Sequence, residues 1–82
     1  MTKDEKFVLK LYKLAKEQGD PTTEIDRYLV GNSLGLHTKA VDSLVQNLMR
    51  SNFVRRRDEN AIYLTEGGLA LVQELSGRMM GK

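Results

Sequence analysis

The chain has 82 residues, of which 40% are hydrophobic and 29% charged, a balance typical of one small globular domain. We therefore expect residues 1–82 to form a single domain, with residues 77–82 frayed at its end. A chain of this size buries only about 60–65% of the surface that its unfolded form exposes, which favours a function at the surface over a deep catalytic cleft. The sequence has no cysteine, which excludes a disulfide framework and a thiolate metal site.

Several other classes of protein are disfavoured by the sequence. No apolar run approaches the roughly 18 residues of a membrane span. The first residues lack the apolar core of a signal peptide, so a cytoplasmic location is expected. No cofactor, metal or small-molecule site is predicted, because His37 is the only histidine and Gly67-Gly68 lacks the lysine and spacing of a phosphate loop. Catalysis needs paired groups converging in a pocket, and none is evident, so we predict that the chain is not an enzyme.

Charge is sorted along the chain, although the net charge is only +2. Residues 1–16 and 38–57 are net positive, whereas residues 17–37 and 58–82 are net negative. In the second positive stretch, Asp42 is the only acidic residue among several cations. Phosphate contact requires such a local excess of positive charge. These cations are Lys39, Arg50, Arg55, Arg56 and Arg57.

A first helix is predicted from Lys3 to Gln18, because Thr2 and Glu5 have the spacing of a capping box and Gly19 ends the helical pattern. One face is apolar: Phe7, Val8, Leu11, Leu14 and Ala15. The opposite face is a stripe of lysines: Lys3, Lys6, Lys10, Lys13 and Lys16. We interpret the stripe as a solvated face, with a second phosphate-contacting surface as the alternative.

A second helix is predicted to open at Asp20-Pro21, which supplies a capping side chain and a proline at the first helical position. Its buried stripe would be Ile25, Tyr28 and Leu29. Residues 30–36 should then turn, since glycine and asparagine adopt left-handed backbone conformations. The candidates for that conformation are Gly31, Asn32 and Gly35, and the leucines expected to anchor the turn are Leu34 and Leu36.

A third helix should begin near His37 or Thr38, with His37 capping it or packing in the turn. Its buried face would be Val41, Leu44, Val45 and Leu48. Its outward face would be Lys39, Ser43, Gln46 and Arg50, flanked by Asp42 and Asn47. Cations, amides and a hydroxyl together suit a major-groove surface. Asp42 is repelled by phosphates unless it caps or pairs locally.

Two short strands are predicted at residues 53–57 and 61–64, joined by the turn-forming triplet Asp58-Glu59-Asn60. Thr65 can cap a last helix, whose core positions would be Leu71, Val72 and Leu75, with Leu69 off that face. Gly67 and Gly68 near its start are expected to permit close packing.

The order helix, helix, turn, helix, two-stranded hairpin, helix resembles that of winged helix-turn-helix domains. Three strings resemble those of bacterial and archaeal regulators of this class: Leu34-Gly35-Leu36 before the third helix, Asn52-Phe53-Val54 at entry to the wing, and Leu64-Thr65-Glu66-Gly67-Gly68 after it. The resemblance spans residues 4–76 and implies an α+β fold with a three-helix core, a short two-stranded wing and a C-terminal helix. Two departures from the compact pattern are the longer stretch between Ile25 and Leu36 and a short wing with acids at its tip.

Charge and resemblance together predict a regulator that binds double-stranded DNA. Base edges would face Lys39, Ser43, Gln46 and Asn47, while Arg50, Arg55, Arg56 and Arg57 would hold the backbone and Thr38 would lie at the start of the same surface. A homodimer reading two half-sites is expected, with Leu9 or Leu69 as candidate contacts. The alternative is a winged-helix module that binds protein instead of DNA.

Overall fold

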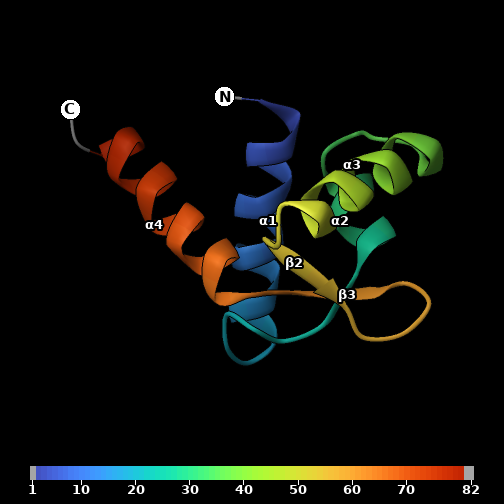
Figure 1. Ribbon diagram of the computed structural model, residues 1–82, viewed down its shortest axis with the longest axis horizontal. Coiled ribbons are helices and arrows are strands. Elements are labelled where there is room, and N and C mark those ends of the chain that lie inside the picture. Colours follow the sequence, from blue (N-terminus) through green and yellow to red (C-terminus); the bar gives the residue numbers. More distant parts are fainter. Residues whose placement is uncertain (1, 81–82) are drawn as a thin grey trace.

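The computed structural model describes residues 2–80, with side chains as far as residue 77. In chain order its elements are α1 (Lys3–Gln18), β1 (Ile25–Asp26), α2 (Arg27–Ser33), α3 (Thr38–Arg50), β2 (Val54–Arg56), β3 (Ala61–Leu64) and α4 (Glu66–Met80). Helices α1, α2 and α3 pack beside a small sheet, and α4 follows β3 and packs against α1 (Figure 1). The predicted α+β winged-helix architecture is therefore confirmed.

Helix α1 has the predicted bounds because its capping box forms. The Glu5 amide donates to the Thr2 hydroxyl at 3.1 Å, and the Thr2 amide donates to the Glu5 carboxylate at 3.0 Å, which satisfies donors that a helix start leaves unpaired. The apolar face is buried at Phe7, Val8, Leu11 and Ala15, and half-buried at Leu14. This face forms the centre of the core.

The predicted helix start at Asp20-Pro21 is wrong. The Asp20 carboxylate accepts from the Thr22 amide at 2.8 Å and from the Thr22 hydroxyl at 2.7 Å, so it closes a turn instead of capping a helix. These hydrogen bonds lower the pKa of the Asp20 carboxyl below its ordinary value. Helix α2 begins at Arg27, with Asp26 as its cap. The later start rotates the buried face, which leaves Leu29 51% exposed instead of buried.

Ile25–Asp26 is a strand that the sequence did not reveal. The antiparallel sheet has the order β1-β3-β2, so β3 lies between the hairpin partner and this added strand. Ile25 pairs with Ile62 on one side of β3, and Arg56 pairs with Ile62 on the other. The wing is thus a hairpin whose inner strand is also tied to the start of α2.

Two glycines, one in the turn between α2 and α3 and one in α2 itself, shape this part of the fold for different reasons. Gly35 has a φ of +75°, a left-handed conformation that glycine adopts without steric cost. The left-handed conformations predicted for Gly31 and Asn32 are wrong, because both residues lie inside α2. Glycine is needed at position 31 for another reason, since a Cβ there would collide with the side chain of Val41 on α3. Leu34 and Leu36 are half-buried against the core, as anchors of the turn should be.

Helix α4 starts against the loop that enters the wing. The Gly68 amide donates to the Thr65 hydroxyl at 3.1 Å, which confirms the predicted cap. A Cβ on Gly68 would collide with the carbonyl oxygen of Phe53, so the predicted close packing is also present. The backbone of α4 is helical to Met80, and the end of the tail predicted to fray, residues 81–82, lies outside the described range. No helix within residues 2–80 is long and apolar enough to cross a membrane.

Candidate nucleic-acid interface

Helix α3 is divided into a buried and an exposed face as predicted. Its buried residues are Val41, Leu44, Val45 and Leu48. Its exposed residues include every one that we selected on this helix: Thr38, Lys39, Ser43, Gln46, Asn47 and Arg50. The Arg50 guanidinium donates to the Asn47 side-chain oxygen at 3.4 Å, so these two polar groups are neighbours at the end of the helix. His37 occupies the cap position but its side chain makes no capping hydrogen bond, contrary to one of its two predicted roles.

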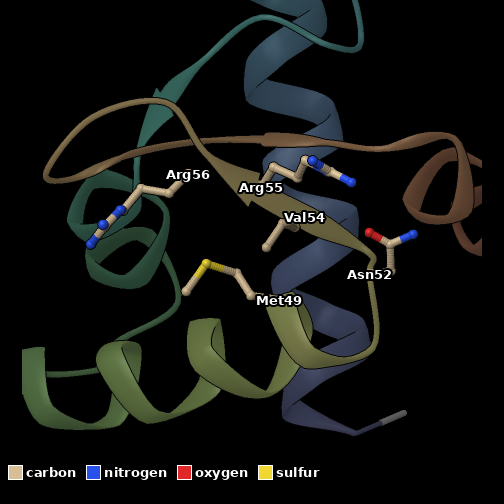
Figure 2. A pocket seen from close by; sticks show the side chains of 5 residues that line it. All are labelled: Met49, Asn52, Val54, Arg55 and Arg56. Atoms are coloured by element: carbon tan, nitrogen blue, oxygen red, sulfur yellow. The ribbon is translucent and has the colours of Figure 1, made fainter.

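The wing arginines are exposed, and two of them meet the end of α3. An open hollow of about 330 Å³ lies between α3 and β2 and is lined by Met49, Asn52, Val54, Arg55 and Arg56. Figure 2 shows Met49 reaching from α3 toward β2, while the guanidinium groups of Arg55 and Arg56 extend in opposite directions along the strand. Two cations of the wing therefore border the same hollow as Met49, near the end of α3.

The third arginine and the wing tip have partners within the chain. Arg57 lies 4.0 Å from the carboxylate of Glu24, and both side chains are largely solvated, so the pair restrains Arg57 only weakly. Asp58 accepts hydrogen bonds from the amides of Asn60 and Ala61 at 3.2 and 3.0 Å. Asp58 thus shapes the turn that carries the tip.

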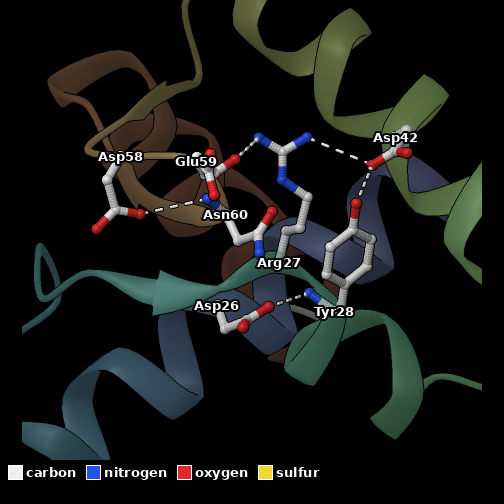
Figure 3. A network of polar contacts seen from close by, with 7 residues as sticks. All are labelled: Asp26, Arg27, Tyr28, Asp42, Asp58, Glu59 and Asn60. Carbon is white, nitrogen blue, oxygen red and sulfur yellow. Dashed lines mark hydrogen bonds and ion pairs between the residues drawn. The ribbon is translucent and has the colours of Figure 1, made fainter.

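A polar network that the sequence did not predict connects the wing tip to α3 (Figure 3). Its centre is Arg27, which is only 8% exposed. One guanidinium nitrogen lies 3.5 Å from the Asp42 carboxylate on α3, and the other donates to the Glu59 carbonyl in the wing turn at 3.3 Å. The Arg27 amide also donates to the Asn60 carbonyl at 2.9 Å. One residue at the start of α2 therefore holds both parts of the candidate interface.

Asp42 is the only acid on α3, and the network accounts for it. Besides the ion pair with Arg27, its carboxylate accepts from the Tyr28 hydroxyl at 2.7 Å. The pKa of the Tyr28 phenol is raised above its ordinary value, chiefly by this hydrogen bond and to a smaller extent by burial. Asp42 is therefore paired locally, which is the condition we set for an acid on a surface expected to meet phosphates.

A signal for this network is present in the sequence. Arg27 is the one Lys or Arg within the acidic stretch 17–37, and Asp42 is the one acid within the basic stretch 38–57. A single cation in an acidic stretch and a single acid in a basic stretch suggest that the two side chains form an ion pair with each other. The Nε of Arg27 has no hydrogen-bond partner among the described residues. The Asp42 side chain of its ion pair is 53% exposed, and an ion pair open to solvent contributes little net stability. Arg27 therefore serves to position the wing more than to stabilise the fold.

The helix pair with a glycine turn, the exposed face of α3 and the adjoining hairpin define the class: this is a winged helix-turn-helix domain. Among residues 2–77, no group of three or more His, Asp or Glu residues is placed to hold a metal ion.

Solved structures of one protein share this fold. A mutant of MepR from Staphylococcus aureus superposes with a TM-score of 0.75 at 19% identity, over 96% of this chain and 58% of that one. MepR itself, a transcription regulator of the S. aureus multidrug efflux pump MepA, superposes with a TM-score of 0.72 at 22% identity, over 95% of this chain and 57% of that one. The chain thus spans less than three fifths of the length of these neighbours. No protein-family model and no curated protein sequence matches it.

Proposed function

We propose that this chain binds double-stranded DNA as the DNA-binding part of a transcription regulator. The observation that carries the proposal is the exposed face of α3, which holds cations, amides and a hydroxyl while its single acid is paired with Arg27 and Tyr28 of the same chain. A surface with this composition is attractive to phosphates and can also hydrogen-bond base edges.

Helix α3 suits the major groove in size and chemistry. Its 13 residues extend about 20 Å, and a helix with side chains is about 10–12 Å across, which matches the width of the groove. Lys39, Ser43 and Gln46 follow one another at spacings of four and three, so they lie along one line of the helix. We assign base contacts to these three and to Asn47.

The remaining selected residues are assigned to the DNA backbone. Arg50, Arg55 and Arg56 surround the end of α3 and the adjoining strand, and Arg57 is close enough to join them by exchanging the weak pair with Glu24 for a phosphate. Thr38 lies at the amino end of α3, where backbone N–H groups favour a phosphate. The acids at the wing tip favour a position along a phosphate strand over entry into the minor groove.

A regulatory role and a homodimer belong to the same proposal. The structural neighbours include a protein described as a transcription regulator, and fold alone does not transfer that role. One copy of so small a domain offers only a short site, so two copies on half-sites one duplex turn apart would supply specificity. Leu9 and Leu69 are less available for this contact than isolated surface leucines, because both pack partly against the core.

The alternative is that the same face binds an acidic protein. A titration separates the two: the ¹⁵N-labelled chain is mixed with a mixed-sequence duplex at low and then moderate salt, and amide shifts are followed by NMR. DNA binding predicts shifts at residues 38–50 and 55–60 that fade as salt rises. Lys16→Ala, which removes a cation far along α1, should leave the pattern unchanged. No shifts at low salt would exclude DNA and favour the protein-binding alternative.

A further inference from the structure

A second cationic surface lies on α1 and has different neighbours. Two open hollows of about 270 and 390 Å³ share Lys6 and Leu34. Together they are bordered by four lysines of α1: Lys3, Lys6, Lys10 and Lys13. Their apolar lining comes from three leucines: Leu9 of α1, and Leu34 and Leu36 of the turn between α2 and α3. We call this surface the α1 groove.

The composition of the α1 groove specifies a ligand by charge complementarity. No acid lines either hollow, and none of the lining residues belongs to the candidate nucleic-acid interface. The lysines are spaced by three, four and three residues, so they follow one side of α1 for about 15 Å, or nearly three helical turns. The leucines are only half-buried beside them. A complementary ligand needs acids at helical spacing next to apolar side chains.

We propose that the α1 groove docks an acidic amphipathic helix of another protein. Such a helix sets its apolar stripe on the leucines while its carboxylates meet the lysines, a recurrent mode of peptide recognition. This surface is separate from α3 and the wing, so the proposal stands whether or not the chain binds DNA.

Two other occupants agree less well with the groove. DNA phosphates would use the lysines but leave the leucines without an apolar partner. A second copy of this chain lacks the matching helix, because none of α1, α2, α3 and α4 carries two acids three or four residues apart. The closest approach to such a pattern is in α4, where Glu66 and Glu74 are separated by eight positions.

The test uses a synthetic helical peptide of about four turns, with glutamates at positions three and four apart beside a stripe of leucines. The control peptide has the same composition in scrambled order. Binding to the full chain is followed by fluorescence anisotropy and by ¹⁵N NMR. We expect the designed peptide to shift amides of residues 6–13 and 33–36 and to bind more weakly as salt rises, and the scrambled peptide to do neither.

Charge reversal provides matched variants. Lys6→Glu with Lys13→Glu changes two exposed side chains and should weaken the designed peptide at least about fivefold, since each exposed pair is lost and replaced by repulsion. Lys16→Glu makes the same change on the same helix outside the groove and should have little effect. A peptide with lysines in place of the glutamates should prefer the charge-reversed chain. Leu9→Ala, confirmed as folded by its NMR spectrum, should also weaken the designed peptide.

Three outcomes would overturn the proposal. Equal binding of the two peptides would reduce the groove to nonspecific charge. Shifts of the groove amides by a DNA duplex, without shifts by the peptide, would assign the lysines to phosphate. Concentration-dependent self-association in sedimentation, abolished by the charge reversal, would assign the groove to a second copy of the chain.

Discussion

The face formed by α3 and the wing and the groove on α1 are both rich in cations, yet their surroundings differ. On the first, lysine and arginine alternate with amides and a hydroxyl, and the one acid, Asp42, is held by Arg27 and Tyr28. On the second, lysines stand beside leucines. Charge brings a polyanion or an acidic protein near both surfaces, whereas the uncharged neighbours decide which ligand each surface can hold.

The largest effect is expected from removing the wing arginines. Changing Arg55, Arg56 and Arg57 to alanine should lower affinity for DNA of any sequence on the order of a hundredfold at 0.1 M salt and reduce the salt slope by up to about 2.7, because each lost phosphate contact removes about 0.9. Changing Lys6, Lys10 and Lys13 to alanine removes the same charge from the α1 groove. If that variant lost DNA affinity equally, the two surfaces would not differ in the way we describe.

A smaller effect is expected from the residues of α3 that we propose face the bases. Ser43→Ala with Gln46→Ala should abolish preference among DNA sequences, worth about 1–3 kcal/mol per good base contact, while binding to nonspecific DNA persists. Selection from a random duplex library measures the preference. Gln73→Ala, an exposed change on α4, is the control. A variant that fails to fold would show that the exposed face of α3 is misassigned.

Arg27 tests whether the wing and α3 act together. Arg27→Met replaces the buried guanidinium by an apolar side chain of similar length and leaves its partner Asp42, which is 53% exposed, in contact with water. Stability measured by urea unfolding should therefore change by only about 1 kcal/mol. The loss of the contact to the Glu59 carbonyl should free the wing tip, speed hydrogen exchange at residues 58–61 and weaken DNA binding several-fold. Arg27→Lys keeps the positive charge but cannot contact Asp42 and the Glu59 carbonyl at the same time. It should weaken DNA binding less than Arg27→Met does. Unchanged exchange in the methionine variant would contradict the positioning role.

The smallest effect is a shift in one titration. Asp42→Asn removes the first cause of the raised pKa of Tyr28, so that phenol should ionise at lower pH, as followed by NMR of ¹³C-labelled tyrosine. Because the folded pKa is raised, the hydrogen bond stabilises the fold below the ordinary pKa of tyrosine and this contribution is lost as pH rises through the folded value. Asp58→Asn, in the wing turn, should leave the Tyr28 titration unchanged.

Local signals predicted the elements that are local in origin. The capping box at Thr2 and Glu5 set the start of α1, and the apolar spacing of α3 identified its buried face. The segment 20–26 was mispredicted because Asp20-Pro21 suits a turn as well as a helix start. Strand β1 has only two residues and exists through its pairing with β3, a nonlocal contact that leaves no periodic pattern.

The sequence predicted only part of the candidate interface, because local patterns do not reveal contacts between distant elements. The selected side chains of α3 and the wing are exposed. Helical spacing predicted this for α3, and the contact of both groups with DNA stays a prediction. The Arg27 network depended on three elements meeting, so neither periodicity nor a motif pointed to it. The isolated opposite charges at positions 27 and 42 were the available signal.

The contact between Arg27 and the wing turn has an entropic consequence. A free hairpin tip would lose conformational freedom on meeting a ligand, at about 1–2 kcal/mol per ordered backbone residue. Here the Glu59 and Asn60 carbonyls are already held by the side chain and amide of Arg27. The ordering cost of the tip therefore falls on folding and not on binding, and the wing is preorganised before any ligand arrives.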